Sequence, residues 1–252
     1  MDPLPLLALA SRLARAAAHA IEAIRAAGYA VDEKRDGSPV TEADRVAEAL
    51  IVEGLRAATP EIPVVAEEEV AGGRLTDCGD LAWMVDPLDG TREFAAGRLE
   101  FTVNIGLIRL GRPWLGAVAI PARGEVFRGI IGLGAWKEDA AGDRAIFARK
   151  PPAEGITVLA SRHYQDDPNL PRFLEGRHVA KIIHIGSAEK FCRIAEGVAD
   201  LYPRFGPTME WDTAAPEAVL IAAGGRVLGL DGMALAYGKP GYLNPPFVAS
   251  GA

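Results

Sequence analysis

Apolar residues recur at helical spacing in two segments near the start of the chain. The first segment predicts an amphipathic helix that ends near Gly28, and the second predicts a helix that opens at residues 41–44. A polar loop is expected between them, from Asp32 to Pro39. The apolar positions of the two helices are Leu6, Leu13, Ala17, Ile21 and Ile24, followed by Val46, Leu50, Ile51 and Leu55.

Shorter apolar runs predict strands. Runs at 62–66 and 81–85 each stop abruptly at carboxylates, and residues 101–131 have the pattern of antiparallel strands separated by turns at 110–113 and 121–124. From residue 156 onward, strands and helices are expected to alternate, which indicates an α/β unit. The expected strands are 156–160, 179–184, 199–203 and 226–230, and the expected helices lie near 168–175, 187–196 and 212–223.

The pattern divides the chain into two halves of an α/β protein. Residues 1–137 are expected to form an α+β half, and residues 155–252 an α/β half. Residues 138–154 are predicted to connect them, because this region is charged, rich in alanine and punctuated by proline.

Composition narrows the class of protein. The 252 residues are 49% hydrophobic and 24% charged, as in an ordinary globular protein, and the net charge of −7 argues against a nucleic-acid polymer as partner. Cys78 and Cys192 lack metal-ligand spacing and are expected to be reduced thiols. No apolar window reaches the ~18–20 residues of a membrane span. The N-terminal leucines lack the positive flank of a signal peptide, so a cytoplasmic protein is expected.

The carboxylates fall at positions that suggest a site. Glu67, Asp86 and Asp212 follow short apolar runs or an aromatic-rich loop, and Asp89 comes three residues after Asp86. Any one of them could be a helix cap or a turn residue. In the sequence DPLDGT at 86–91, however, the proline and glycine restrict the turn so that both aspartates can point to one side.

Four convergent carboxylates require compensating charge. Two of them ~4 Å apart repel by roughly 4 kcal/mol at an effective dielectric of 20. An all-oxygen ligand set favours Mg²⁺, or Mn²⁺ as a substitute, and two or three such ions would make the site attractive to an anion. The helix expected to start at Thr91 favours phosphate as that anion. The residues therefore indicate a metal-assisted phosphate-ester hydrolase.

Three ordered motifs resemble the signatures of the inositol monophosphatase superfamily, which consists of lithium-sensitive, Mg²⁺-dependent phosphatases. They are AEE at 66–68, WMVDPLDGT at 83–91 and WDTAAP at 211–216, and the resemblance runs from about Ile21 to Phe247. It implies a layered α-β-α-β-α sandwich of the sugar-phosphatase type, with the site between the two halves.

The flanking sequences are similar to one branch, the CysQ-type 3′(2′),5′-bisphosphate nucleotidases. These flanks are GTREF at 90–94, EFTVNI at 100–105, GSAEKFC at 186–192 and YPRFGPT at 202–208. The resemblance implies removal of the 3′-phosphate of adenosine 3′,5′-bisphosphate to give AMP, with 3′-phosphoadenylyl sulfate as a possible second substrate. An inositol, histidinol or fructose phosphate phosphatase, or a catalytically silent phosphate-binding regulatory protein, remains an alternative.

The resemblance also implies roles for individual residues. The first metal ion would be held by Glu67, Asp86 and the Leu88 carbonyl. The second would be held by Asp86, Asp89 and Asp212, and a third, weaker one by Glu67. Asp44 and Thr91 would orient the attacking water, and the backbone of Gly90 and Thr91 would cradle the phosphate. The other residues expected to bind substrate are Ser161, Gly186, Ser187, Lys190 and Asp212.

Several alternatives stay open in the sequence. Glu68 could replace Glu67 as a ligand, and Asp44 could only cap its helix, since residues 41–44 form a capping-box variant. Lys190 and Arg204 could reach a second phosphate or could lie on solvated surfaces. A monomer or a homodimer is expected. Two further points concern the loops: residues 161–164 read SRHY where the branch often has SRSH, and His163, His178 and His184 are expected to be loop or sheet residues rather than ligands.

Overall fold

The computed structural model describes residues 1–33, 37, 39–164 and 167–252. Helix α1 (Pro3–Ala27) begins where the Asp2 side chain accepts the Leu4 N–H, and it ends at Gly28, whose φ is 84°. Helix α2 (Glu42–Ala58) follows Thr41, which forms a capping box with Asp44. Both predicted helices are therefore confirmed.

The loop expected from Asp32 to Pro39 is shorter than predicted. Strands β1 (Val31–Glu33) and β2 (Pro39–Thr41) form an antiparallel pair, so both ends of the expected loop are extended. The sequence did not predict β1, because the strand is exposed along its length and therefore has no alternation of apolar and polar residues. It is defined only by its backbone pairing with β2. Residues 34–36 and 38 lie outside the described residues.

A seven-stranded sheet forms the N-terminal part of the molecule, in the order β3-β4-β5-β6-β7-β8-β9. Strand β3 is parallel to β4, and the remaining neighbours are antiparallel. The strands are β3 (Val64–Ala66), β4 (Leu81–Asp89), β5 (Thr102–Arg109), β6 (Arg112–Ile120), β7 (Glu125–Ile130), β8 (Gly134–Asp139) and β9 (Gly142–Ile146).

Strand β9 lies within the segment expected to connect the two halves. The boundary placed after residue 137 falls inside β8, so the first sheet extends to Ile146. Four of the five β9 residues are exposed, as is common for an edge strand, and two of these, Asp143 and Arg144, are charged. The sequence of an edge strand of this kind is hard to distinguish from that of a linker.

The second sheet has the order β11-β10-β12-β14-β13 and combines parallel and antiparallel pairs. Its strands are β10 (Ile156–Ser161), β11 (Val179–Ile185), β12 (Leu201–Arg204), β13 (Arg226–Gly229) and β14 (Phe247–Ser250). Strand β14, inserted between β12 and β13, was not predicted, because four residues are too few for a clear period-two pattern. The expected C-terminal helices are α5 (Asn169–Leu174), α6 (Glu189–Ala195) and α7 (Glu210–Ala222).

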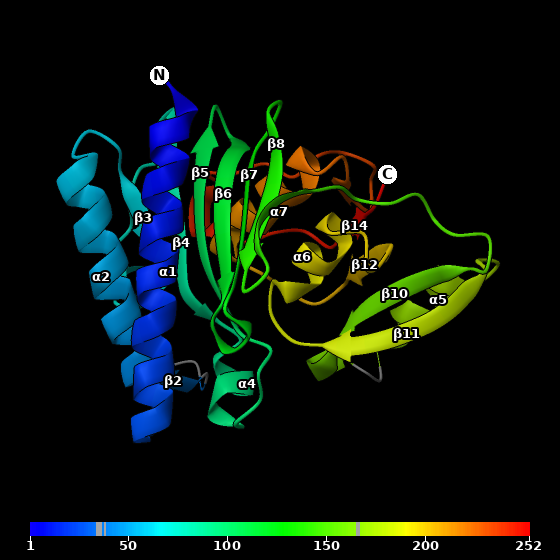
Figure 1. Ribbon diagram of the computed structural model, residues 1–252, viewed down its shortest axis with the longest axis horizontal. Coiled ribbons are helices and arrows are strands. Elements are labelled where there is room, and N and C mark those ends of the chain that lie inside the picture. Colours follow the sequence, from blue (N-terminus) through cyan, green and yellow to red (C-terminus); the bar gives the residue numbers. More distant parts are fainter. Residues whose placement is uncertain (34–36, 38, 165–166) are drawn as a thin grey trace.

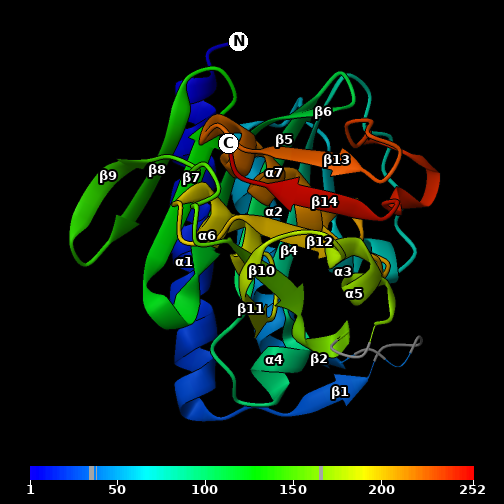
Figure 2. The ribbon, with the colours of Figure 1, turned by 90° about the vertical axis from the view of Figure 1, so that its right-hand side faces the viewer.

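The layers form the sandwich implied by the resemblance (Figure 1). Helices α1 and α2 cover one face of the seven-stranded sheet, and α6 and α7 lie between this sheet and the five-stranded one. Helix α5 packs on the outer side of the second sheet, where Leu170 and Leu174 contact Val158 and Leu201. Figure 2 looks onto the second sheet. Within the described residues, no helix is long and apolar enough to cross a membrane.

Glycines in the first sheet allow α7 to approach it closely. A Cβ atom at Gly116 would lie 2.4 Å from the Ala215 carbonyl oxygen, and one at Gly106 would lie 2.6 Å from the Ala215 nitrogen. Any larger residue would push the helix away from the sheet. This close contact holds the first turn of α7, which carries Asp212, beside the first sheet.

Candidate active site

The acidic turn at residues 86–91 is built into the end of β4. Strand β4 continues to Asp89, beyond the predicted end at Val85, with a register irregularity between Asp86 and Asp89. The Asp86 Oδ1 atom accepts the Leu88 N–H at 3.0 Å. Gly90 then adopts a left-handed φ of 93°, and helix α4 (Thr91–Ala95) begins at the next residue. Local backbone geometry thus fixes this end of the site.

Asp44 caps its helix and also contacts Thr91, the residue with which it was predicted to orient the attacking water. Its Oδ2 atom accepts the Thr41 N–H and the Thr41 hydroxyl, each at 2.7 Å, which caps α2. Its Oδ1 atom lies 3.0 Å from Thr91 Oγ1, which is also 3.0 Å from the Leu88 carbonyl oxygen. The Thr91 hydroxyl has one proton for these two acceptors, so its lone pairs remain available to a water molecule.

A cavity of about 210 Å³ lies against this turn. Asp86 and Leu88 are each 1% exposed, and Asp44 contacts the cavity residue Thr91. The remaining predicted site residues all line the cavity: Glu67, Asp89, Gly90, Thr91, Ser161, Gly186, Ser187, Lys190 and Asp212. The structure therefore brings together residues from both halves of the sequence.

The two candidate glutamates occupy different surroundings. Glu67, the first residue of α3 (Glu67–Ala71), lines the cavity, and its charge contributes to raising the pKa values of Asp86 and Asp212. The Glu68 N–H instead donates to the Glu48 carboxylate at 2.8 Å. Burial, together with the neighbouring Glu68 charge, raises the pKa of Glu48 to about 7. This arrangement favours Glu67 as the ligand, which stays a prediction.

Burial and mutual repulsion make the carboxylates difficult to ionise together. Burial raises the pKa of Asp86 well above its ordinary value, and the Glu67, Asp89 and Asp212 charges add to the effect. The pKa of Asp212 is raised to about 8, first by burial and then by Asp89 and Glu67. A divalent cation would relieve this repulsion, and the oxygen donors suit Mg²⁺.

The oxygen atoms of these residues are of the kind that binds Mg²⁺, but they do not surround a single point in this structure. Among the residues that the structure describes, no three His, Cys, Asp or Glu side chains stand in a common metal-binding geometry. One oxygen of Asp89 accepts the Ala188 N–H at 2.5 Å, and one oxygen of Asp212 accepts the Met209 N–H at 2.8 Å. The other oxygen of each of these two carboxylates is not used in these hydrogen bonds and can serve as a metal donor.

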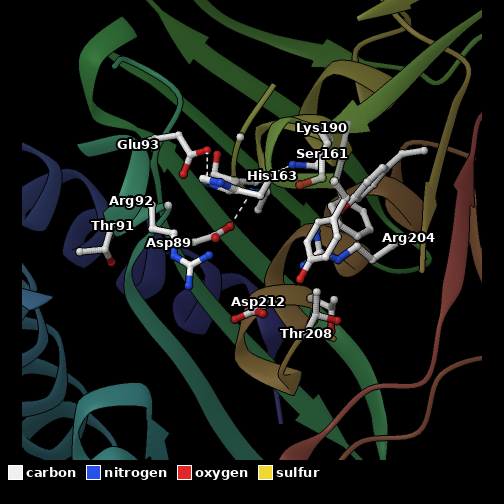
Figure 3. Close-up of a pocket in the computed structure, with 18 of the residues that line it drawn as sticks. Asp89, Thr91, Arg92, Glu93, Ser161, His163, Lys190, Arg204, Thr208 and Asp212 are labelled. Carbon is white, nitrogen blue, oxygen red and sulfur yellow. Dashed lines mark hydrogen bonds and ion pairs between the residues drawn. The ribbon is translucent and has the colours of Figure 1, made fainter. Parts of the chain in front are cut away.

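Two cations line the side of the cavity formed by the C-terminal half. Lys190 is only 3% exposed and donates to the Ser187 and Ile185 carbonyl oxygens at 2.6 and 3.2 Å, so the solvated-helix interpretation is wrong. Burial lowers the pKa of Lys190 to about 8, although the Asp89 charge opposes this. Arg204 donates to the Gly206 and Pro207 carbonyl oxygens at 3.1 and 2.8 Å. Figure 3 shows Thr91 and Arg204 on opposite sides of the cavity, with Asp89 and Asp212 between them.

Sequence reasoning missed part of the cavity wall. Glu93 and Thr208 line the cavity beside His163 and Tyr164, which belong to the atypical loop at 161–164. The His163 Nε2 atom lies 2.8 Å from Glu93 Oε1. The positions of residues 93 and 163 in the sequence do not predict this contact, because only the fold brings the two side chains together.

The layered sandwich and its buried acidic turn facing a cavity define a class of α/β phosphatases. The chain belongs to the inositol monophosphatase family, whose profile matches residues 2–250. Among named relatives, the 3′(2′),5′-bisphosphate nucleotidase CysQ of Escherichia coli O157:H7 is 42% identical over 244 residues, covering 95% of this chain and 97% of the relative. The enzyme of the same name from Salmonella typhimurium is 44% identical over 217 residues, covering 85% and 86% of the two chains.

Solved structures show the same fold. CysQ from Bacteroides thetaiotaomicron, described as a bacterial member of the inositol monophosphatase family, has a TM-score of 0.81 at 33% identity and covers 98% of this chain and 97% of its own. The inositol monophosphatase from Anabaena (Nostoc) sp. PCC 7120 has a TM-score of 0.79 at 28% identity, with 99% and 92% coverage. The fold is thus common to both branches, and sequence identity separates them more clearly than backbone shape.

Proposed function

We propose that this protein is a Mg²⁺-dependent 3′(2′),5′-bisphosphate nucleotidase that converts adenosine 3′,5′-bisphosphate to AMP and phosphate. The observation that carries the proposal is the 42% identity to a named nucleotidase across 95% of this chain. The cavity agrees with it, because cations lie across the cavity from the Thr91 turn, where a second phosphate group can be bound. The sulfated relative 3′-phosphoadenylyl sulfate is a possible second substrate.

In the proposed reaction, different residues bind the two phosphates and orient the water. The backbone N–H groups at Gly90 and Thr91 hold oxygens of the phosphate to be removed. The Thr91 hydroxyl, fixed by Asp44, orients the attacking water. Lys190 and Arg204 hold the second phosphate.

Glu67, Asp86, the Leu88 carbonyl, Asp89 and Asp212 would hold the metal ions, two or three in number, with Mn²⁺ as a substitute. When bound, these ions lower the pKa of water and neutralise charge on the phosphoryl group. The cytoplasmic location and the monomeric or homodimeric state remain predictions.

Two alternatives differ in chemistry. A family member acting on inositol, histidinol or fructose phosphates would not need a second anion site, yet Lys190 and Arg204 both line the cavity. A catalytically silent phosphate-binding regulator would not need the water-orienting pair, yet Asp44 and Thr91 are hydrogen-bonded at 3.0 Å. Both observations favour the nucleotidase.

A substrate panel tests the proposal. Adenosine 3′,5′-bisphosphate is expected to exceed inositol 1-phosphate at least tenfold in kcat/KM, which corresponds to about 1.4 kcal/mol of transition-state stabilisation. Chelation should abolish phosphate release, added Mg²⁺ should restore it, and Li⁺ should inhibit it. Equal rates on the two compounds would move the protein to the inositol phosphatase branch. Activity that survives exhaustive chelation would contradict the metal-dependent reaction.

A further inference from the structure

One ion pair and one further close contact hold the turn at the end of β10 against the N-terminal half. Residues Arg162–Tyr164 form the 3-10 turn η2 directly after Ser161. Arg162 pairs with Glu100, and His163 Nε2 lies 2.8 Å from Glu93 Oε1. The turn that departs from the usual sequence of the branch is therefore held by two carboxylates of the N-terminal half.

Glu93 is the more deeply buried of these carboxylates. It lies in α4, two residues after Thr91, and is 2% exposed, whereas the His163 side chain is 34% exposed and lines the cavity. A Cβ atom at Gly186 would lie 2.6 Å from Glu93 Cγ, so the Gly186–Ser187 backbone rests directly against this side chain. Glu93 thus touches two separate parts of the cavity wall, and Figure 3 shows its contact with His163.

We propose that Glu93 is a positioning residue for substrate selection. It fixes the His163 ring and supports the Gly186–Ser187 turn, so that the wall facing the part of the substrate beyond the reacting phosphate keeps its shape. The partly exposed His163 presents its ring to that part of the substrate, and Glu93 acts only through it and through the turn. The inference deepens the proposed function and rests on it for the identity of the substrate as a nucleotide.

The contact predicts a particular kinetic pattern. Glu93→Ala and His163→Ala should each raise KM for adenosine 3′,5′-bisphosphate about tenfold and leave kcat within about twofold, because the Thr91–Asp44 pair is untouched. The double variant should be no worse than Glu93→Ala alone, since that variant already removes the contact with His163. Glu93→Gln should recover most of the loss, because it keeps the size of the side chain against Gly186 and an oxygen atom close to His163 Nε2. KM for p-nitrophenyl phosphate, which has no nucleoside, should not change.

Controls separate this role from a general effect on folding. Glu138→Gln alters the ion pair with Arg15 on a distant surface and should leave KM for both substrates unchanged. If Glu93→Ala does not fold, His163→Ala and Glu93→Gln still carry the test. Additive losses in KM, or an equal rise in KM for p-nitrophenyl phosphate, would overturn the inference.

Failure of the proposed function gives a different result. The wild-type substrate panel identifies the preferred substrate, and the variants are then measured on that compound. If inositol 1-phosphate is preferred, the nucleotidase proposal fails, while a non-additive rise in KM on the preferred substrate still supports the positioning role. If the nucleotide is preferred and KM for it does not change in the variants, only the positioning role is overturned.

Discussion

The two sides of the cavity are built in opposite ways. The side proposed to hold the reacting phosphate is built around one continuous segment, residues 86–91, whose geometry is set by a strand irregularity, an Asp86 side-chain contact to the Leu88 N–H and the left-handed Gly90. The other side is assembled from separated segments that contribute Ser161, Gly186, Lys190 and Arg204. Its shape depends on ion pairs and packing between the two halves of the chain.

This difference suggests a division between rate and selectivity. On the side built around residues 86–91, most substitutions would disrupt the turn that positions the reacting groups. Substitutions there should therefore lower kcat. The assembled side can change one contact at a time, so changes there should act on KM for particular substrates. Members of one family can therefore keep the same reaction and accept different substrates.

The largest expected effect tests the locally built side. Thr91→Ala should lower kcat by about 10²–10⁴-fold, because a positioned partner of the reacting water is lost, and it should leave Mg²⁺ binding nearly unchanged. Asp44→Ala should have a similar effect, with an additional loss of about 0.5–2 kcal/mol of stability from the helix cap. Steady-state kinetics, metal titration and melting temperature measure these quantities.

The double variant distinguishes the two roles of Asp44. If both residues serve one water, Thr91→Ala combined with Asp44→Ala should have nearly the kcat of either single variant. Independent, multiplicative losses in kcat would show that the residues do not act as a pair. A kcat preserved in Asp44→Ala, with a lowered melting temperature, would leave Asp44 as a cap alone.

A smaller effect is expected from the assembled side. Lys190→Met should raise KM for the bisphosphate about 10–100-fold and spare inositol 1-phosphate, because a charge-assisted contact to the second phosphate is lost. Lys181→Met is a matched control, since Lys181 is exposed on β11 and should not affect either substrate. Equal losses on both substrates would indicate that Lys190 only supports the turn through its bonds to Ser187 and Ile185.

The smallest effect on activity is expected from helix α7, which carries Asp212, where the predicted change is in the pH dependence of stability. Burial raises the pKa of Glu217 to about 8, although its hydrogen bond from the Tyr237 hydroxyl opposes this. The folded state therefore holds a proton that the unfolded chain releases near pH 4.3, and stability decreases as the pH rises toward and through 8. Glu217→Gln removes this titration. Between pH 6 and 9 the wild type should therefore lose about 2–3 kcal/mol more of its free energy of unfolding than the variant does. Urea unfolding at both pH values measures the difference, and parallel pH curves would contradict it.

Much of the architecture could be predicted from local patterns. The helices α1 and α2 and the long strands of the first sheet have strong periodicity, because each buries one face or lies in the core. Strand β9 was placed in the connecting segment because an exposed edge strand has no hydrophobic signal, and β14 is too short to show one. The acidic turn was visible because proline, glycine and two aspartates act within six consecutive residues.

The sequence by itself determined the reacting end of the site, since turn geometry and carboxylate spacing are properties of neighbouring residues. It also contained the capping box that links Thr41 and Asp44. The resemblance implied that Asp44 and Thr91 act together, and the structure shows their contact. Only the tertiary structure decided that Lys190 is buried at the cavity and that His163 meets Glu93. These contacts join residues far apart in the chain, and their geometry depends on how the two sheets and α7 pack, which no local pattern encodes.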